Sequence, residues 1–567
     1  MVLAIGCMRL STASLPSERA EAVVQAALEA GVRVLDTADV YGPDDASLHH
    51  NEQLIARVLS RWSGPEVRVF TKGGLTRPGG RWVPDGRAKH LRAACEASAR
   101  ALGVARIDRY QLHAVDPKTN LVTSARALAK LQRDGVVREV GVCNVTVGQL
   151  RAVRAHVEVA SVQVCVSPWD THAIRSGIVA YCLEHGIEVL FHSPLGGWAK
   201  AGRVDRDRRL AAAVADTDVT PAQAVLAWLR SLGGTPLPGP TRVETARACG
   251  AVPLEASVRD ALDARTPVAD QLRRPRSQRQ PAPDAEGDVV MVMGMQGVGK
   301  TTAARAFVDR GYVRLNRDEQ GGTLKKLHRG LDARLAAGAR RVVLDNTYPS
   351  RAVRNEVIEV AWRHGVPVRA VWLDAPVEDA RIGVVQRMLE RHGRLLDPEE
   401  LAAIGKKDPS VFGPRVHARY LQAFEAPSAD EGLEVEVVPA RAVEPTGPRW
   451  FAVDLDTLLQ TDPAVIEATY ATDTTPIIVI AWQPTEGQVR ALDALRVRVG
   501  APLPLHACTH PPGPLVCWCR PPMPGLLLAA AHEHGLSLGA ATYVGPDPFA
   551  ARFAAACRLA GSRASLS

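Results

Sequence analysis

A glycine-rich loop followed by lysine and threonine is the clearest chemical pattern in the chain. The segment VVMVMGMQGVGKTTAARAF (289–307) contains the spacing G-x-x-x-x-G-K-S/T between a buried-type strand and a helical pattern. Backbone N–H groups of such a loop wrap phosphate oxygens, the lysine reaches the terminal phosphates, and the threonine hydroxyl can bind Mg²⁺. The sequence therefore predicts an ATP/Mg²⁺ site. Its expected residues are Gly294, Gly297, Gly299, Lys300, Thr301 and Thr302.

Three further segments supply groups for phosphoryl transfer. Asp318 follows a short predicted strand, where its carboxylate could accept a proton from a hydroxyl. A second strand ends at Asp345 and Asn346. The helical segment RIGVVQRMLERHGR carries Arg387, whose charge could neutralise the transferred group. Together these residues predict a kinase that acts on a hydroxyl.

Residues 288–440 resemble the kinase domain of polynucleotide kinase-phosphatases. The shared patterns are the phosphate loop, NRD followed closely by glycine, and LDNTYPSRAVR. The resemblance implies that Asp318 is the general base on a 5′-hydroxyl end of nucleic acid. It implies that Asp345 and Asn346 support the phosphate and the acceptor. Tyr348 would lie near the acceptor or the nucleoside, and its role stays open. A P-loop kinase of a small metabolite is the alternative, and no motif discriminates DNA from RNA.

Polar residues at the ends of predicted strands point to a second activity. Before residue 266, strand-like and helix-length segments alternate about eight times, as in a (β/α)8 barrel. Asp36, Tyr41, Lys72 and His113 lie at or just after such strands. A tyrosine can protonate a carbonyl oxygen when a nearby ammonium lowers its pKa and a carboxylate holds that ammonium. The constellation predicts carbonyl reduction.

Residues 1–262 resemble the aldo-keto reductase family through LDTADVYG, GVCN, HSPLG and PGPTR. The resemblance implies that Tyr41 is the proton donor, that Asp36 and Lys72 tune it, and that His113 orients a small carbonyl substrate. It also implies NADP(H) as cofactor. The expected cofactor-binding residues are Asn144, Gln163, His192, Ser193, Thr241 and Arg242.

Two positions of this segment depart from the family pattern. His192 stands where the family has an aromatic residue beneath the nicotinamide, and Cys249 stands where it has asparagine. The alternative is therefore a barrel that keeps the tetrad of Asp36, Tyr41, Lys72 and His113 but binds the cofactor poorly. The sequence does not discriminate NADPH from NADH.

Four metal-ligand residues lie close together near the C-terminus. Cys508, His510, Cys517 and Cys519 suit a closed tetrahedral Zn²⁺ site that pins a loop. Residues 449–567 resemble the haloacid-dehalogenase phosphatases of the heptose-bisphosphate and histidinol-phosphate branch, which carries such a zinc loop. The resemblance implies a Rossmann-like domain with a structural zinc ion.

The catalytic positions of that phosphatase pattern are mostly replaced. Asp454 and Asp456 preserve the pair of aspartates that supplies the nucleophile and the general acid/base in these phosphatases. Ala481, Pro521 and Pro546 stand where a hydroxyl residue, a phosphate-binding lysine and a metal-binding aspartate are expected. Without the lysine and the aspartate, developing negative charge and Mg²⁺ lose their partners. We expect an inactive phosphatase, with Asp547 as the residue that could still supply a metal ligand.

Composition sets the frame for these sites. The 567-residue chain carries a net charge of +8, which permits a polyanionic partner. The sequence contains no uninterrupted run of about 18 apolar residues, so no membrane span is predicted. The absence of a signal-peptide pattern predicts a cytoplasmic protein. The expected organisation is α/β throughout: a barrel (1–265), a linker (266–287), a P-loop parallel sheet with helices on both faces (288–440) and a phosphatase-like domain (449–567).

These domains together predict an enzyme of nucleic-acid end processing or repair fused to a reductase. The alternative from a different class is a scaffold whose flanking domains are pseudoenzymes. An intact phosphate loop and an intact tetrad favour the enzyme. The sequence does not specify an oligomeric state.

Overall fold

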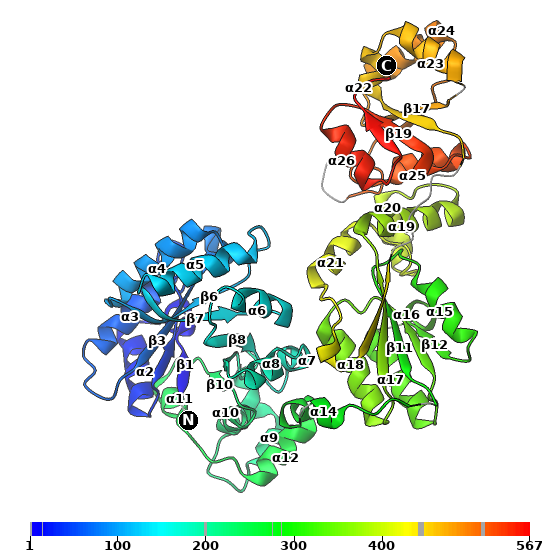
Figure 1. Cartoon of the computed structure of the whole chain (residues 1–567). Coiled ribbons are helices and arrows are strands. Elements are labelled where there is room, and N and C mark those ends of the chain that lie inside the picture. The colour runs from blue at the N-terminus through cyan, green and yellow to red at the C-terminus, as the bar shows by residue number, and fades with distance from the viewer. Residues whose placement is uncertain are drawn as a thin grey trace. The chain divides into compact units, whose positions relative to one another are not determined.

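Eight parallel strands pair with one another in chain order in the first half of the molecule (Figure 1). The N–H of Gly6 on the first strand donates to the carbonyl of Pro238 beyond the last, at 2.9 Å, and nearly closes the barrel. The strands are β1 (Ala4–Gly6), β2 (Val34–Asp36), β3 (Arg68–Gly73), β6 (Ile107–Leu112), β7 (Val137–Cys143), β8 (Ser161–Cys165), β9 (Glu188–His192) and β10 (Thr235–Leu237). The predicted (β/α)8 barrel is confirmed.

The computed structural model describes residues 3–13, 15–197, 201–274, 276–284, 286–321, 323–439, 447–473, 475–511 and 516–566. Parts of the predicted linker and of the segment before the C-terminal sheet lie outside these residues, at 275, 285 and 440–446. In the described chain, no helix is long and apolar enough to cross a membrane.

Helices cover the outside of the barrel, and apolar side chains fill its inside. Ala4, Val34, Phe70, Leu190 and Leu237 form one buried cluster from five different strands, as expected for a packed barrel. The main helices are α2 (Ser17–Glu29), α3 (His50–Leu59), α4 (Ala88–Leu102), α5 (Leu121–Arg133), α6 (Val147–Arg154), α8 (Ile178–Glu184), α10 (Pro221–Ser231) and α12 (Ala256–Arg265). Shorter ones are α1 (Met8–Thr12), α7 (His172–Arg175), α9 (Arg208–Ala213) and α11 (Val243–Arg247).

The segment expected as an exposed linker differs from that expectation in its first part. Val268 and Leu272 pack against the barrel core, and two short helices, α13 (Asp270–Arg273) and α14 (Arg276–Arg279), occupy the arginine-rich stretch. The described chain divides by compactness into two units, Met1–Arg279 and Gln280–Ser567. A few apolar residues among many polar ones were enough to attach this segment to the barrel.

The second unit begins with a five-stranded parallel sheet in the order β12-β13-β11-β14-β15. Successive residues of a strand face opposite sides of the sheet, and β11 packs against helices on both sides. Met291 packs with residues of α17 and α18, whereas Val292 packs with α15. The expected parallel sheet with helices on both faces is confirmed. The strands are β11 (Val289–Met293), β12 (Val313–Asn316), β13 (Val342–Asp345), β14 (Val368–Asp374) and β15 (Glu434–Pro439).

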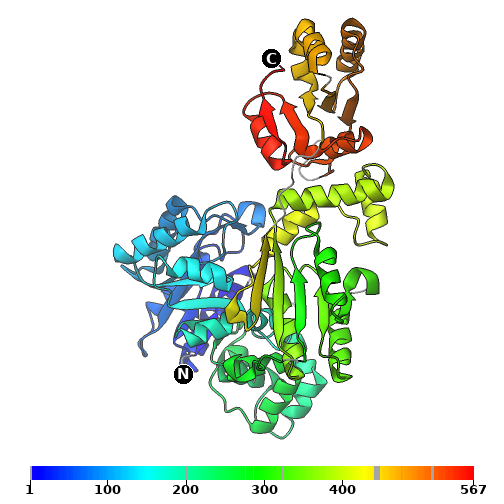
Figure 2. The same cartoon turned by 45° about the vertical axis from the view of Figure 1, so that its right-hand side comes forward.

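Helices lie on both sides of this sheet (Figure 2). They are α15 (Lys300–Val308), α16 (Arg317–Gln320), α17 (Leu324–Ala336), α18 (Arg351–Arg363), α19 (Val377–His392), α20 (Pro398–Gly405) and α21 (Arg415–Ala423). Helix α15 starts at the end of the phosphate loop, so the loop's N–H groups lie at a helix N-terminus.

A second five-stranded parallel sheet follows, in the order β18-β17-β16-β19-β20. Its strands are β16 (Trp450–Asp454), β17 (Ile477–Trp482), β18 (Leu505–Cys508), β19 (Ala541–Val544) and β20 (Gly561–Arg563). Its helices are α22 (Leu455–Gln460), α23 (Pro463–Asp473), α24 (Glu486–Val499), α25 (Gly525–Glu533) and α26 (Phe549–Ala556). Within the second unit, α25 packs on α19, and Val385 and Leu389 of α19 share one buried core with Trp518 and Leu527.

Candidate functional sites

The barrel brings the four predicted catalytic residues together at the carboxyl ends of its strands. Lys72 is fully buried, and its Nζ lies 2.6 Å from Asp36 Oδ2 and 3.5 Å from the Tyr41 hydroxyl. The Tyr41 hydroxyl is also 3.5 Å from His113 Nε2. Tyrosine therefore lies between a cation and an imidazole, which is the arrangement that proton donation to a carbonyl oxygen requires.

Burial and charge set the protonation of this cluster. Burial raises the pKa of Tyr41 to about 12, with the Lys72 charge opposing the shift, so the phenol holds its proton at neutral pH. Burial alone would lower the pKa of Lys72, but Asp36 more than offsets it and the pKa is raised. Burial, followed by the Lys72 charge, lowers the pKa of His113 well below its usual value. The resting site thus contains an ammonium, a neutral phenol and a neutral imidazole.

The residues expected to bind cofactor lie on neighbouring strands. Asn144 Oδ1 is 3.1 Å from His192 Nε2, and His192 Nδ1 is 3.2 Å from Ser193 Oγ. Gln163 instead donates from Nε2 to Asp36 Oδ1 at 2.8 Å. Arg242 lies exposed at the start of α11. The side chains of Asn144, His192 and Ser193 form one polar row beside the tetrad, which fits a nicotinamide amide.

Thr241 and Cys249 lie around α11. Thr241 directly precedes Arg242 and is half-buried, whereas the Cys249 side chain is buried. A buried thiol offers no amide in place of the family's asparagine. The late segment therefore presents a threonine and an exposed cation, but no side-chain amide at this position.

Sequence reasoning missed two residues of the barrel site. Gln111 of β6 is buried and donates to the same Asp36 oxygen as Gln163, at 3.2 Å. Trp82 packs edge-on against Tyr41 at 6.0 Å and against His113 at 6.3 Å between ring centroids. Gln111 was detectable as a polar residue inside a buried strand, but Trp82 lies in a loop and carries no local signal.

The phosphate loop joins the carboxylate at the end of β13. Thr301 Oγ1 donates to Asp345 Oδ2 at 3.1 Å, and a hydroxyl beside a carboxylate is the oxygen pair that Mg²⁺ prefers. Arg314 and Asn316 also donate to Asp345 Oδ2, at 2.6 and 3.0 Å. No role was predicted for Arg314, and Asn316 was noted only as part of the NRD pattern. Asp345 is therefore a buried carboxyl group that accepts from three donors.

Lys300 lies among the other predicted kinase residues. Its Nζ donates to the Met295 carbonyl at 2.7 Å. Burial lowers the pKa of Lys300 to about 8; Asp345 and Asp318 oppose this shift, and Arg387 adds to it. Asp318, at the start of α16, and Arg387, on α19, are both exposed. The fold thus brings a carboxylate and a guanidinium from distant segments into the electrostatic range of one lysine.

Two other kinase expectations have different outcomes. Asn346 is almost buried, and its Nδ2 lies 3.5 Å from the Tyr348 hydroxyl. Tyr348 has no exposed surface and packs in the core between the sheet and its helices, so its ring is not presented to an acceptor or a nucleoside in this structure. A tyrosine ring at this loop fills apolar space that its sequence position did not reveal.

Gly297 brings the phosphate loop against α19. A Cβ added to Gly297 would lie 2.2 Å from the Ala380 carbonyl, so no side chain fits there. The loop's Gln296 carbonyl is 2.9 Å from His417 Nε2 on α21. Burial lowers the pKa of His417 to about 4, so the ring is neutral and donates this hydrogen bond. Helices α19 and α21 therefore support the loop from outside the sheet.

The four predicted zinc ligands lie together. Their ligand atoms all lie within 4.8 Å of one another. Cys508 Sγ is 3.8 Å from Cys517 Sγ and 3.3 Å from His510 Nδ1, and Cys519 Sγ is 3.8 Å from the same nitrogen. Tetrahedral zinc with Zn–S bonds of about 2.3 Å places two sulfurs about 3.8 Å apart. The donor set and its spacing fit Zn²⁺.

The carboxylates at the end of β16 lack such support. Asp454 caps α22 through the N–H of Thr457 at 3.1 Å, and burial raises its pKa. Asp456 accepts from Gln488. Among the described residues, no lysine or arginine makes an ion pair with either aspartate. Asp547 is exposed on the loop after β19.

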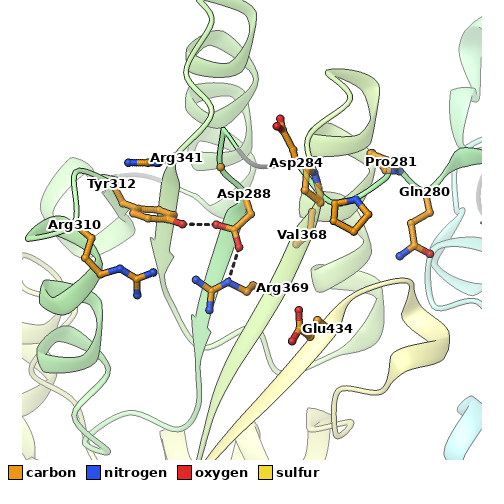
Figure 3. A pocket seen from close by; sticks show the side chains of 13 residues that line it. Gln280, Pro281, Asp284, Asp288, Arg310, Tyr312, Arg341, Val368, Arg369 and Glu434 are labelled. Atoms are coloured by element: carbon orange, nitrogen blue, oxygen red, sulfur yellow. Dashed lines mark hydrogen bonds and ion pairs between the residues drawn. The ribbon is translucent and has the colours of Figure 1, made fainter.

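A cavity of about 790 Å³ lies at the opposite edge of the kinase-like sheet, where β11 and β14 begin (Figure 3). Asp288 at its centre accepts from the Tyr312 hydroxyl at 2.6 Å and from Arg369 Nε at 2.5 Å. These groups already satisfy one another. In open parallel sheets ligands bind at the carboxyl ends of strands, so this hollow is not the expected nucleotide site.

The comparisons with known proteins assign the first half of the chain. The aldo/keto reductase family matches residues 2–263. An uncharacterised oxidoreductase of Schizosaccharomyces pombe is 33% identical over 221 residues, which cover 38% of this chain and 68% of the relative. The chain belongs, through this N-terminal region, to the aldo/keto reductase family.

Two solved structures also resemble the chain. A glycerol dehydrogenase from Gluconobacter oxydans has a TM-score of 0.41 and 22% identity, covering 48% of this chain and 92% of its own. An aldo/keto reductase from Klebsiella pneumoniae, in complex with NADP and acetate, has a TM-score of 0.40 and 20% identity, covering 46% and 89%. In the second unit, a family described as an AAA domain matches residues 289–406, which fits a P-loop kinase-like domain.

Proposed function

We propose that the protein is a two-activity enzyme that phosphorylates 5′-hydroxyl ends of nucleic acid with ATP and reduces a small carbonyl compound with NADP(H). Residues 288–440 would carry the kinase, and residues 449–567 would be a phosphatase-like domain without catalytic function. The proposal is supported by two separate clusters of chemically suited side chains, one in each unit.

In the kinase, the acceptor oxygen attacks the γ-phosphorus of ATP while the bond to the β–γ bridging oxygen breaks and ADP leaves. Asp318 takes the proton of the attacking hydroxyl. Lys300 and Arg387 stabilise the negative charge of the transferred group, and Thr301 with Asp345 would hold Mg²⁺.

The observation that favours a polymeric acceptor is the open position of Asp318. Its side chain is 45% exposed, whereas a kinase of a small metabolite needs an enclosed acceptor pocket. Lys325, Lys326 and Arg329 are exposed on the first turns of α17, directly after α16. Cations in such a position suit the phosphates of a nucleic-acid strand.

The experiment is phosphate transfer from γ-labelled ATP to 5′-hydroxyl DNA and RNA oligonucleotides and to a nucleoside 3′-monophosphate. We expect transfer to an oligonucleotide, with a much lower kcat/KM for the mononucleotide because it lacks the phosphates that the cations contact. Equal or better use of the mononucleotide, or no transfer to any acceptor by a protein that binds ATP, would favour a metabolite kinase.

In the barrel, the carbonyl oxygen would lie against the Tyr41 hydroxyl and His113, and Tyr41 would protonate it. NADP(H), when bound, supplies the hydride that reaches the carbonyl carbon. Lys72, held by Asp36, stabilises the phenolate that remains. Asn144, His192 and Ser193 would hold the nicotinamide end, and the exposed Arg242 would pair with the adenosine phosphate.

Substitution of Tyr41 tests the reductase. We expect Tyr41→Phe to lower kcat for aldehyde reduction about 100-fold or more, because a positioned acid contributes about 10²–10⁴. The measurement is NADPH oxidation with small aldehydes, and cofactor affinity serves as the control because Tyr41 does not hold the cofactor. Full activity in the variant would remove Tyr41 from catalysis and favour a scaffold.

A further inference from the structure

The C-terminal Cys/His cluster is connected to the phosphate loop by a continuous set of packed side chains within the second unit. The first link is His510, whose Nε2 lies 2.8 Å from Asp397 Oδ1 at the start of α20. A ligating histidine commonly donates its second N–H to a carboxylate, which fixes the ring for the metal. Here that carboxylate comes from the kinase-like part of the chain.

The second link is Trp518, which lies between the ligands Cys517 and Cys519. Its side chain is only 1% exposed, and its indole N–H donates to the Phe412 carbonyl at 2.9 Å. Its ring packs edge-on against His417, at 5.7 Å between centroids. Cys517 and Cys519 are therefore joined through the intervening Trp518 to an aromatic contact inside the kinase-like part.

The third link is His417, which donates to the Gln296 carbonyl of the phosphate loop. This carbonyl and the N–H of Gly297 belong to one planar peptide group, so holding one fixes the direction of the other. The next carbonyl of the loop, that of Gly297, packs directly against the backbone of α19. A Cβ added to Gly383 of this helix would lie 2.2 Å from the Gly297 carbonyl oxygen. Two neighbouring peptide groups of the loop are thus held from outside the sheet.

We propose that a metal ion bound by Cys508, His510, Cys517 and Cys519 holds the phosphate loop in its ATP-binding shape through Trp518 and His417. The inference rests on the proposed ATP site but not on the identity of the acceptor. It gives the C-terminal sheet a physical role although its phosphatase positions are replaced: the domain positions the kinase loop. Trp518 and His417 are positioning residues.

The first experiment compares metal-loaded, chelated and zinc-reloaded full-length protein. Zinc content is measured by mass spectrometry, and Mg²⁺-ATP affinity by calorimetry. We expect chelation to raise the Kd for ATP about 10-fold, which is the effect of losing one well-placed hydrogen bond. Reloading with Zn²⁺ should restore the original Kd. An unchanged Kd after zinc loss would overturn the inference.

The second experiment uses a matched pair of tryptophans. Trp518 and Trp450 are both buried in the same core, and each donates one indole N–H to a carbonyl, of Phe412 at 2.9 Å and of Ser537 at 2.8 Å. We expect Trp518→Phe to weaken ATP binding severalfold with zinc still bound, and Trp450→Phe to leave ATP binding unchanged. Equal effects of the two variants would indicate general loosening and would contradict the proposed connection.

Two further variants locate the ends of the connection. Asp397→Asn is expected to lower zinc affinity about 10-fold. His417→Ala is expected to weaken ATP binding with zinc content unchanged, and His417→Gln, which can still donate to Gln296, to restore part of it. If ATP binding responds to zinc but no oligonucleotide is phosphorylated, the acceptor is wrong and this inference stands. If zinc-loaded protein binds no ATP, both fail.

Discussion

The two five-stranded sheets of the second unit share a layout but differ in the charges at their carboxyl edges. Each has its first strand, β11 or β16, in the centre with a carboxylate-bearing strand end nearby. In the kinase-like sheet, Asp345 is 2.6 Å from Arg314 and acts on the pKa of Lys300. In the C-terminal sheet, Asp454 accepts from Thr457, and no lysine or arginine of the described residues makes an ion pair with it.

The difference shows that strand-end carboxylates alone do not make a phosphoryl-transfer site. Phosphoryl oxygens are anionic, so carboxylates need cations beside them before a phosphate can approach. The first sheet has Lys300 and Arg387 near its carboxyl edge, whereas among the described residues no lysine or arginine pairs with Asp454 of the second sheet.

The largest effect is expected from removing the central cation. Lys300→Ala should lower the rate of phosphate transfer from ATP about 1000-fold, because the lysine contacts charge that grows in the transition state. The measurement is label transfer from γ-labelled ATP. Lys407→Ala, which removes an exposed lysine elsewhere in the same region, is the control and should retain full activity. A comparable loss of phosphate transfer in both variants would show that the effect does not depend on the position of the Lys300 charge at the phosphate loop.

Removing the proposed base should have the next largest effect. Asp318→Asn preserves shape but cannot accept a proton, so we expect kcat to fall about 100-fold with the Kd for ATP unchanged. Single-turnover transfer and ATP calorimetry separate the two quantities. A large rise in Kd with unchanged kcat would assign Asp318 to nucleotide binding instead.

A smaller effect is expected from pH. Because burial lowers the pKa of Lys300 to about 8, the free protein loses this ammonium as pH rises above 8. ATP binding needs the charge, so the Kd at pH 9 should be about 10-fold above that at pH 7. Lys300→Arg keeps its charge throughout this range, and its Kd should be nearly independent of pH. The same rise in the arginine variant would exclude Lys300 as the titrating group.

No effect is expected from the carboxylate of the second sheet. Asp454→Asn should leave both phosphate transfer and phosphomonoester hydrolysis unchanged, since the wild-type domain is expected to hydrolyse nothing above background. Assays with a panel of phosphomonoesters and Mg²⁺ check this. Hydrolysis by the wild type that disappears in the variant would erase the contrast between the sheets and point to Asp547 as a metal ligand.

Much of the architecture was predictable because local patterns carry it. Alternating strand-like and helix-like segments predicted the barrel, and the strand–loop–helix context of Lys300 predicted the first parallel sheet. Strand-end positions also predicted the meeting of Asp36, Lys72 and His113, since the carboxyl ends of parallel strands share one edge. The linker was predicted less well, because Val268 and Leu272 pack against the barrel core, and a local sequence pattern does not reveal such a contact.

The sequence by itself therefore determined the fold class, the phosphate loop, the four polar residues of the barrel site and the Cys/His cluster, all of which depend on residue type and short spacing. Only the tertiary structure decided that Tyr348 is buried and that Trp82 packs edge-on against Tyr41. It also decided that Asp397 contacts His510, and that His417 contacts both Trp518 and the phosphate loop. These contacts depend on which helix faces pack together. Such packing is a property of the whole apolar core, and no local spacing records it.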